Sequence, residues 1–469
     1  MNRAGTETKN FRQNIREHTT VANFADARDF LQESLPSSPK VLYSKDVGLK
    51  RAKTFYELLG NPQENYKSIH IAGTSGKGST AYYLSSLLQK HGFKVGTHVS
   101  PHIYDIRERA MINLKWMPKL QFIECVNSLI PKINKMGSSF YGRPTYFEVC
   151  TAMAFLIFKN ENVDYAVVET GIGGQYDATN TINRNDKLSV ITRIGLDHTN
   201  ILGKTIADIT RQKAQILTNR GNGFFLNSSQ EARKVIIDVA ATKNANAHEV
   251  NIDNFANNIR VSWKGILFDY SGKVDIKDIF IPTIAKYQVE NATMAIQALE
   301  TLASRDGFDI DKNKVKDAFA TTYIPARMEV RNIGNKTIIL DGAHNPQEIR
   351  ILIDSLNELN LAKKPIFIFG AKADKDTGEM LDIILPYAQK VNLCSFFKDT
   401  KTSHLRSLSS KSKKMVAVIN ESKFRNKIGK FFNNPRDALM QTIDENNDKE
   451  QIIVMTGSMY MIGDLQPSS

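Results

Sequence analysis

The sequence is poor in cysteine, with only Cys125, Cys150 and Cys394 among 469 residues. An odd number of widely spaced cysteines excludes a disulfide scaffold and a cysteine-rich zinc module. Unpaired thiols are typical of a reducing compartment. The sequence therefore predicts a cytoplasmic protein.

Long apolar runs are also missing from the chain. No stretch approaches the ~20 consecutive apolar residues that span a bilayer, and residues 1–20 lack the apolar core of a secretory signal. Glu7 and Glu17 argue against a transit peptide. We expect neither a targeting segment nor a membrane partner.

What the chain does have is an ordinary globular composition with an excess of positive charge. Apolar residues make up 41% and charged residues 24%, which is enough for a sizeable buried core. Lys and Arg number 62 against 49 Asp and Glu, a formal net charge of +13. This excess favours an acidic partner, and a nucleic acid, an anionic membrane, a nucleotide or a small polyanion would each satisfy it.

Strand-like and helix-like patterns alternate along the first part of the chain. In order they predict a helix at 24–35, a strand at 68–73, a helix at 77–90, a strand at 93–100, helices at 119–135 and 147–159, and strands at 164–170 and 187–194. Such alternation is typical of a mostly parallel sheet covered by helices. Residues 248–284 differ, because short alternating pieces separated by Gly and Asp predict β-hairpins.

The alternation restarts after a helical pattern at 288–303 and a proline-containing segment at 323–330. Strands are predicted at 336–345, 365–374, 390–397 and 451–458, with helical patterns between them. We therefore expect an α/β protein of two domains, the second smaller than the first. The predicted parts are a polar N-terminal extension (1–22), a larger domain (23–324) and a C-terminal domain (325–469).

A glycine-rich segment, Gly73 to Ser79 (GTSGKGS), joins a predicted strand to a predicted helix. Glycines allow backbone N–H groups to turn inward around phosphate oxygens, and the helix start adds its positive dipole end. Lys77 would meet the outer phosphates, and the hydroxyl of Ser79 or Thr80 would reach Mg²⁺. The spacing departs from the usual P-loop, since Gly78 follows the lysine. The alternative is a strand-to-helix turn without a ligand.

Three further segments place polar groups at the ends of predicted strands, where open α/β sheets bind ligands. They contribute Ser100 of HVSPH, Glu169 ahead of three glycines, and His198 of the Asp197-His198 pair. A hydroxyl, a carboxylate and an imidazole could complete a Mg²⁺ sphere. The alternatives are a structural histidine and a carboxylate in a cap or ion pair. From the sequence alone, Lys213 is a solvated helix lysine.

Ten segments in the same order resemble the folylpolyglutamate synthase/dihydrofolate synthase family of the Mur ligase superfamily. They are AGTSGKGST (72–80), VSPHIYDIRERAMIN (99–113), VVETGIGGQYDATNT (167–181), ITRIGLDHTNILG (191–203), RQKAQI (211–216), YQVENATMAI (287–296), PARMEV (325–330), ILDGAHNP (339–346), FGAKADKD (369–376) and MTGSMYMIGDL (455–465). Each segment is weak alone, but ten in the family's order are specific. Ser75, where the family usually has Asn, and Gln175, where it often has Arg, depart from the pattern.

The resemblance implies an ATP-dependent amide ligase with a P-loop sheet domain and a Rossmann-like C-terminal domain. It implies that Gly76, Lys77, Gly78, Ser79 and Thr80 bind the ATP phosphates and that Asn291, Arg327 and Asp341 contact ATP. Ser100, Glu169 and His198 would bind Mg²⁺, with two ions expected. The family's lysine at the position of Lys213 is carbamylated, which turns an ammonium into a metal-binding carboxylate.

The resemblance also implies the reaction, in which L-glutamate is added to a pterin or folate carboxylate through an acyl phosphate. The acceptor is dihydropteroate, a reduced folate, or both. We take His344 and Ser458 as glutamate contacts, and the alternative for each is a loop-capping role. The 323–330 segment would be the hinge for domain closure. We expect a monomer that uses small-molecule substrates and binds no nucleic acid.

Two other functions compete with this interpretation. Another Mur-type ligase would carry a separate nucleotide-binding domain before the P-loop, but only 67 residues precede Ser68. A nucleic-acid-binding P-loop NTPase would place basic residues and aromatics together on one surface.

The positive charge is concentrated in one segment of the second domain. Residues 401–430 contain nine Lys or Arg and one acidic residue, a net +8, which leaves +5 of the total of +13 for the rest of the chain. We interpret the segment as a solvated surface. The alternative is that it attracts a polyglutamate tail or ATP at low salt.

Overall fold

The structure is a computed structural model that describes residues 20–36, 46–396 and 424–465. Most of the predicted N-terminal extension and residues 401–423 of the basic segment lie outside the described residues. Within the described parts, no helix combines the length and apolar character needed to cross a membrane. Cys125, Cys150 and Cys394 are all buried free thiols.

An eight-stranded sheet forms the centre of the first domain, in the order β4-β3-β2-β5-β1-β6-β7-β8. Its strands are β1 (Lys67–Ala72), β2 (Val95–His98), β3 (Met111–Ile112), β4 (Lys115–Trp116), β5 (Tyr165–Glu169), β6 (Leu188–Ile191), β7 (Asn222–Leu226) and β8 (Asn246–Val250). Only the β2–β3 and β3–β4 pairs are antiparallel. The other pairs are parallel.

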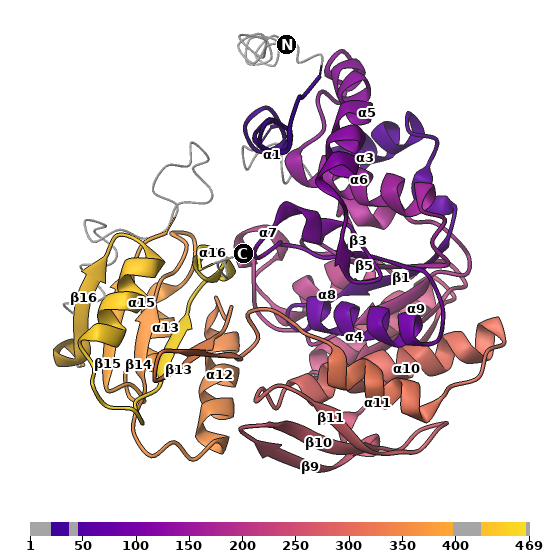
Figure 1. Cartoon of the computed structure of the whole chain (residues 1–469). Helices are drawn as coiled ribbons and strands as arrows, with labels where there is room; N and C mark the ends of the chain where they lie inside the picture. The colour runs from indigo at the N-terminus through magenta and orange to yellow at the C-terminus, as the bar shows by residue number, and fades with distance from the viewer. Residues whose placement is uncertain (1–19, 37–45, 397–423, 466–469) are drawn as a thin grey trace.

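Helices cover both faces of this sheet, as buried parallel strands require (Figure 1). The helices of this domain are α1 (Phe24–Glu33), α3 (Asp46–Glu57), α4 (Lys77–Lys90), α5 (Lys119–Gly137), α6 (Tyr146–Asn160), α7 (Thr199–Leu202), α8 (Ile206–Ala214), α9 (Gln230–Thr242), α10 (Gln288–Asp306) and α11 (Lys312–Thr321). Ile69 and Ile71 of β1 pack with α4, α10 and α11. Ala166 and Val168 of β5 pack on the opposite face with α1, α3, α5 and α6.

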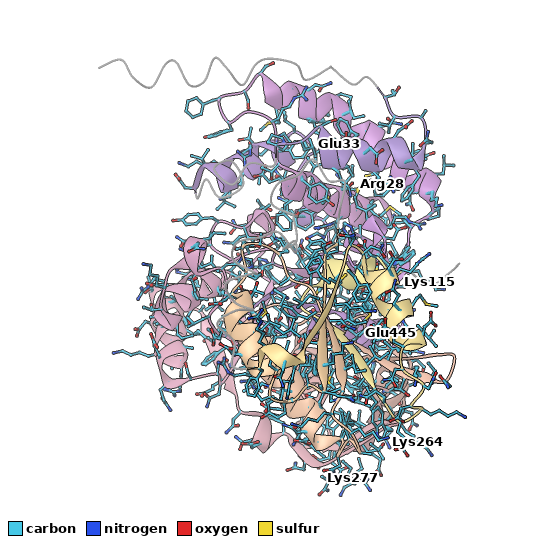
Figure 2. All side chains as sticks on the ribbon, turned by 90° about the vertical axis from the view of Figure 1, so that its left-hand side faces the viewer. Arg28, Glu33, Lys115, Lys264, Lys277 and Glu445 are labelled. Atoms are coloured by element: carbon cyan, nitrogen blue, oxygen red, sulfur yellow. The ribbon has the colours of Figure 1, made fainter. Side chains whose placement is uncertain are left out.

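A separate antiparallel sheet lies under α10 and α11, in the order β11-β10-β9 (Figure 1). It contains β9 (Ala256–Ser262), β10 (Gly265–Tyr270) and β11 (Ile276–Ile281). The predicted hairpins are therefore present, but residues 248–250 belong instead to the parallel strand β8. In Figure 2, Lys264 and Lys277 of this layer lie at the opposite end of the molecule from Arg28 and Glu33 of α1.

The second domain has a six-stranded sheet in the order β12-β13-β17-β14-β15-β16, parallel except for the β12–β13 pair. Its strands are β12 (Glu329–Ile333), β13 (Lys336–Leu340), β14 (Ile366–Phe369), β15 (Lys390–Cys394), β16 (Ile428–Phe432) and β17 (Ile453–Thr456). Its helices are α12 (Pro346–Glu358), α13 (Thr377–Ile384), α15 (Pro435–Asp444) and α16 (Met459–Gly463). The α/β fold class predicted from the sequence is confirmed.

The chain passes from α11 to β12 through residues 322–328. Ala326 and Met328 in this segment have positive φ values of 54° and 47°, which non-glycine residues adopt at a cost of about 1 kcal/mol or more. The Glu329 carboxylate accepts the Ala326 N–H at 3.0 Å and ties the end of the segment to β12. The domain limits and the hinge at 323–330 stay predictions.

Tyr104 connects the first domain to the start of the second. Its hydroxyl donates to Glu329 Oε2 at 3.1 Å and accepts from Arg331 Nη2 at 2.6 Å. The Arg331 guanidinium also lies 5.6 Å from the Tyr104 ring centroid. Glu329 and Arg331 both belong to β12, so one hydroxyl links the 100–109 loop to the second sheet.

Tyr104→Phe is expected to lower the free energy of unfolding by about 1–2 kcal/mol, because two hydrogen bonds to charged groups are lost. Denaturant unfolding of the full chain measures this change. Tyr387→Phe is the matched control, since Tyr387 is 41% exposed in the second domain. An unchanged unfolding midpoint for Tyr104→Phe would contradict a stabilising role for the link.

Candidate active site

The glycine-rich segment lies at the carboxyl end of β1 and leads into α4. Gly76 is the N-cap of α4 with a φ of 86°, a conformation that favours glycine. A side chain on Gly76 would also collide with the amide of Asn291 on α10. The bare backbone at Gly76 therefore leaves the start of α4 open, as phosphate binding requires.

Lys77 lies at the start of α4 and faces the carboxylate of Glu169 at the end of β5. The two groups are 3.8 Å apart, and Lys77 Nζ also donates to the Thr74 carbonyl at 3.3 Å. The second oxygen of Glu169 accepts the backbone N–H of Ser100 at 3.0 Å. Burial raises the pKa of Glu169, while Lys77 and the Ser100 N–H oppose the rise.

The hydroxyls that follow Lys77 are buried against α10. Ser79 Oγ accepts a hydrogen bond from Gln288 at 3.2 Å, and Gln288 in turn accepts one from Asn291 at 2.9 Å. Thr80 is fully buried, and its hydroxyl has no hydrogen-bond partner within the part of the chain that the structure describes. A side chain on Gly78 would place its Cβ 3.3 Å from Glu169, so the backbone approaches this carboxylate closely.

Ser100, Glu169 and His198 were predicted as metal ligands, and the structure joins the first two directly. His198 is the N-cap of the short helix α7, with a φ of 49° and a side chain 30% exposed. Its ring lies 3.8 Å from the neighbouring Asp197 carboxylate. Within the described residues, His198 makes no hydrogen bond to Ser100 or Glu169.

The donor set fits a hard cation only together with a phosphate ligand. Among the residues described, no group of three or more His, Cys, Asp or Glu side chains converges to hold a metal. Glu169 is nevertheless a buried carboxylate beside Ser100, and the Lys77 ammonium that faces it is 3.8 Å away. Mg²⁺ prefers such oxygen ligands and completes its sphere with nucleotide phosphates.

Lys213 is buried, so the solvated lysine expected from its helical context is wrong. Its side chain is 5% exposed, and Nζ donates to the carbonyl of Gly73 at 2.7 Å. Burial and the nearby Lys77 cation lower the pKa of Lys213 to about 7. Its amine therefore lies directly behind the phosphate loop, with a substantial neutral fraction near pH 7.

Arg327 and Asp341 approach the same region from the second domain. Asp341, at the end of β13, accepts hydrogen bonds from the Tyr287 hydroxyl at 3.0 Å and the Met328 N–H at 2.9 Å. Tyr287 is the N-cap residue of α10 in the first domain, so Asp341 connects the two domains. The Arg327 guanidinium lies against Met459 of α16, 4.0 Å from its sulfur.

Asp197 joins the domains at a second point, which the sequence analysis did not predict. Its carboxylate lies 2.9 Å from Lys375 Nζ and 3.8 Å from His344 Nε2, both in the second domain. His344 also lies 3.1 Å from Glu348 on α12, and Ser75 of the phosphate loop donates to Glu348 at 3.2 Å. Lys375 and Asp197 both lie in segments that resemble the family, FGAKADKD and ITRIGLDHTNILG. Only the fold shows that the two side chains form an ion pair.

His344 is the charged centre of this second contact. Burial disfavours its protonation, but the Glu348 and Asp197 carboxylates outweigh burial and raise the pKa of His344 to about 9. His344 is therefore a cation at pH 7. A protonated imidazole at the domain boundary fits the predicted contact with a glutamate carboxylate, and it would have to exchange partners to make that contact.

Ser458 caps a helix in the structure, which is the alternative role considered for it from the sequence. It is the N-cap of α16, and its Oγ accepts the Tyr460 N–H at 3.2 Å. Its side chain is 2% exposed. The glutamate contact assigned to Ser458 stays a prediction.

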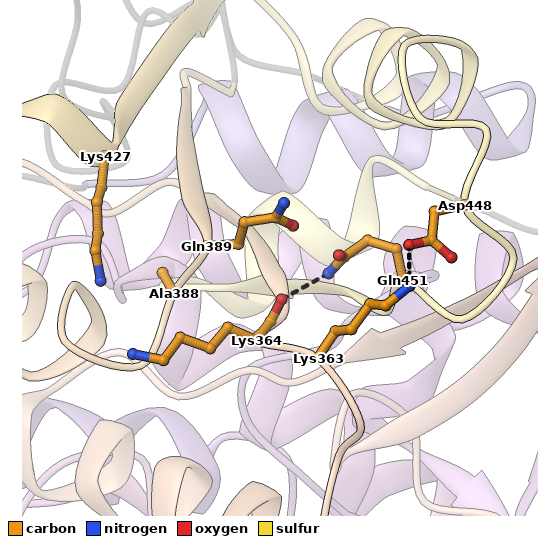
Figure 3. A pocket seen from close by; sticks show the side chains of 7 residues that line it. All are labelled: Lys363, Lys364, Ala388, Gln389, Lys427, Asp448 and Gln451. Atoms are coloured by element: carbon orange, nitrogen blue, oxygen red, sulfur yellow. Dashed lines mark hydrogen bonds and ion pairs between the residues drawn. The ribbon is translucent and has the colours of Figure 1, made fainter.

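Two cavities are lined by residues in the described parts of the chain, and neither lining includes Lys77 or Glu169. One, of about 560 Å³, lies at the amino edge of the second sheet (Figure 3). Lys364 and Lys427 there donate to the Pro386 and Leu385 carbonyls just after α13, and Lys363 pairs with Asp448. These contacts assign the lysines to structural roles.

The other cavity, of about 250 Å³, lies between the three-stranded sheet and the interdomain segment. It is lined by Trp263, Tyr323, Arg327 and Gln288 among others. Gln288 in this lining also donates a hydrogen bond to Ser79 at 3.2 Å. One lining residue of this cavity is therefore in direct contact with the end of the glycine-rich segment.

Two family models match the chain, and together they cover most of it. The Mur ligase middle domain matches residues 71–299, and the dihydrofolate synthetase C-terminal domain matches residues 326–467. A folylpolyglutamate synthase of Lacticaseibacillus casei is 32% identical over 71% of this chain and 77% of that protein. The chain belongs to the folylpolyglutamate synthase/dihydrofolate synthase family.

The family relationship extends over nearly the whole length. The dihydrofolate synthase/folylpolyglutamate synthase of Bacillus subtilis is 29% identical over 94% of this chain and 98% of that protein. The structure of Mycobacterium tuberculosis folylpolyglutamate synthase complexed with ADP superposes with a TM-score of 0.82. It is 26% identical and covers 94% of this chain and 97% of its own. The family predicted from ten sequence segments is confirmed.

Proposed function

We propose that this protein is an ATP-dependent ligase that adds L-glutamate to the carboxylate of a pterin or folate. The observation that carries the proposal is the meeting of a phosphate loop, a buried carboxylate and two domain-bridging contacts at one edge of the first sheet. Glu169 lies between Lys77 and Ser100, while Asp197 and Asp341 connect this edge to the second domain. Membership in the family and the nucleotide complex of the Mycobacterium relative support it.

The first step activates the acceptor. A carboxylate oxygen attacks the γ-phosphorus of ATP, the bond to the β-phosphate oxygen breaks, and an acyl phosphate and ADP result. This step depends on positioning and on neutralising charge. Lys77 supplies a fixed cation at the phosphates, and Arg327 supplies a second one from the other domain.

The second step forms the amide. The neutral amine of glutamate attacks the acyl carbon, a tetrahedral intermediate forms, and inorganic phosphate leaves with the bonding electrons while the amine loses a proton. His344 and Ser458 are the glutamate contacts in this proposal. Enclosure between the domains excludes water, which would otherwise hydrolyse the acyl phosphate.

Mg²⁺ belongs to this proposal, with Ser100, Glu169 and His198 as its ligands and two ions expected. When bound, the metal neutralises phosphate charge and orients the γ-phosphate. Gly76, Gly78, Ser79, Thr80, Asn291 and Asp341 complete the proposed ATP contacts. Burial raises the pKa of Glu169 in spite of the nearby Lys77 ammonium, so a divalent ion at this carboxylate would stabilise its ionised form.

Lys213 is the proposed carbamate. Its neutral amine attacks CO₂, a nitrogen–carbon bond forms, and one proton is released, leaving a carboxylate on the side chain. The burial of Lys213 and its pKa of about 7 supply the neutral amine that this reaction needs. The cost of burying a lysine among other cations falls when its charge becomes negative.

The proposal also includes a cytoplasmic monomer that has no nucleic-acid or membrane partner. Its substrates are ATP, L-glutamate and either dihydropteroate or a reduced folate. Residues 424–430 of the basic segment are described, and in them Lys427 caps the Leu385 carbonyl while Lys430 pairs with Glu445. The idea that residues 401–423 attract a polyglutamate tail stays a prediction.

The test is an assay of purified protein with ATP, Mg²⁺, labelled L-glutamate and each acceptor in turn. We expect ADP release that requires both an acceptor and glutamate, with label incorporated into the pterin product. Single-stranded DNA and RNA serve as controls and are expected not to stimulate ADP release. ADP release that is independent of every pterin would contradict the proposal.

A further inference from the structure

Arg109 is a buried guanidinium without a carboxylate partner among the described residues. It ends the short 3₁₀ helix Ile106–Arg109 and is 4% exposed. Its Nε donates to His102 Nδ1 at 3.0 Å, its Nη1 donates to Ser100 Oγ at 3.3 Å, and its centre lies 5.1 Å from the Tyr146 ring. All three partners are neutral. No Asp or Glu in the described parts of the chain forms an ion pair with it.

A second buried arginine in the described parts of the chain, Arg51, does have a carboxylate partner. Among the described residues, Arg51 and Arg109 are the two buried arginines. Arg51 forms two hydrogen bonds of 2.8 and 2.7 Å with the carboxylate of Glu148. A buried cation without such a partner loses its hydration and gains no ion pair in return. Arg109 feels the Glu169 carboxylate only at longer range, so its guanidinium has no ion pair among the described residues and can take an anion from outside the chain.

The position of Arg109 shows where that anion would bind. Its partner Ser100 donates its backbone N–H to Glu169, and Glu169 faces Lys77 of the phosphate loop at 3.8 Å. Arg109 is therefore linked to the phosphate loop through Ser100 and Glu169. An anion held by Arg109 would lie beside the terminal phosphate, where an acceptor must be placed to attack it.

Hydrogen bonds within the loop that carries Arg109 fix its conformation before any ligand binds. The Glu108 carboxylate accepts backbone N–H groups from Ile103, Tyr104 and Asp105 at 2.7 to 2.9 Å. Asp105 caps the 3₁₀ helix through the Arg107 N–H at 2.9 Å. A guanidinium held by such a loop loses little conformational entropy when a ligand binds.

We propose that Arg109 binds the carboxylate of the pterin acceptor and orients it for attack on ATP. The inference rests on the proposed function and extends it to a named contact. A guanidinium presents parallel N–H donors that match a carboxylate, whereas a lysine presents a point charge. One carboxylate oxygen is held by Arg109, and the other is left to attack the γ-phosphorus.

The experiment compares two ligands that differ only in the reacting group: pteroic acid and its primary amide. Binding of each is measured by titration calorimetry on the full chain with Mg²⁺ and a non-hydrolysable ATP analogue. The wild-type protein is expected to bind the acid at least about 30-fold more tightly than the amide, the value of a buried charge pair. Arg109→Gln is expected to bind the two ligands within about threefold of each other.

Arg107→Gln is the matched control. Arg107 is two residues away on the same helix, but it pairs with Asp105 at 2.8 Å and lies over the Phe24 and Trp116 rings. It is expected to keep the wild-type preference for the acid. Arg109→Lys keeps the positive charge but loses the paired N–H donors of the guanidinium. We expect its preference for the acid over the amide to lie between those of Arg109→Gln and wild type.

The ratio of the two dissociation constants, for the acid and for the amide, distinguishes a binding role of Arg109 from a structural one. A purely structural role for Arg109 would weaken the acid and the amide equally, and an unchanged ratio in a folded Arg109→Gln protein overturns the inference. Loss of ATP-analogue binding without a change in the ratio overturns it too. If Arg109→Gln does not fold, a wild-type protein that fails to discriminate acid from amide overturns it independently.

The inference and the proposed function can fail separately. A wild-type protein that adds glutamate to pterins while Arg109→Gln keeps the acid preference contradicts the role of Arg109 alone. A wild-type protein that adds glutamate to no pterin acid contradicts the proposed function and this inference with it.

Discussion

Lys77→Ala is expected to lower the rate of ATP-dependent glutamate addition by about 10³-fold or more while leaving the fold intact. A fixed charge at a transferring phosphoryl group contributes on this scale. In the structure its Nζ donates to the Thr74 carbonyl and lies 3.8 Å from the Glu169 carboxylate. Its loss removes the cation from the phosphate loop and leaves the buried Glu169 carboxylate without its ion-pair partner, which raises the pKa of Glu169 further.

The measurement is ADP release under saturating ATP, with circular dichroism as the check of folding. Lys90→Ala is the control, because Lys90 ends the same helix and pairs with Asp317 on the surface. It is expected to remain near the wild-type rate. Substantial turnover by Lys77→Ala would contradict the assignment of the phosphate loop.

Lys213→Ala is expected to lose about 10²-fold or more of the activity, because the carbamate that would bind metal and orient phosphate cannot form. A short carboxylic acid such as acetate is expected to restore part of the rate, since it can occupy the space that the lysine leaves. Labelled bicarbonate provides a second measurement, in which a carbamate signal is expected for wild type and absent for the variant.

Lys77→Ala is the control for the rescue. Acetate supplies a carboxylate and not a cation, so it is expected to restore nothing to that variant. Wild-type activity of Lys213→Ala would contradict the carbamate. A full loss without rescue and without a labelled signal in wild type would assign Lys213 to support of the Gly73 carbonyl.

The central elements of the fold were predictable because their patterns are strong and local. The helix predicted at 77–90 is present as Lys77–Lys90, and the strand predicted at 164–170 is present as Tyr165–Glu169. Both are long or strongly apolar and are bounded by glycine or turn residues. Strands β7 and β8 were not predicted, because NGFFL and NAHEV contain Gly, Asn and charged residues that disfavour a strand in isolation.

The site was predictable only in part, because local motifs identify residues but do not show which of them come into contact. Gly76, Lys77 and Glu169 could be named from local motifs at strand ends, where chain direction already indicates the edge of the sheet. The contacts of Asp197 with Lys375 and His344, and of Ser75 with Glu348, could not be predicted, because nothing in their local sequences shows that they face one another across two domains. The same holds for Arg109, since only the folded structure shows that it is buried without a direct ion pair among the described residues.

By itself, the sequence determined the class of this protein: an α/β chain with a phosphate loop and ten segments in the order of one ligase family. These are properties of local pattern and chain order, which do not depend on long-range packing. The tertiary structure decided which charges are buried and what they face. It placed Lys213 behind the phosphate loop with a pKa of about 7, where a solvated lysine was expected, and it buried Arg109 without a direct ion pair among the described residues. Burial and pairing depend on residues far apart in the chain, so only the folded structure determines them.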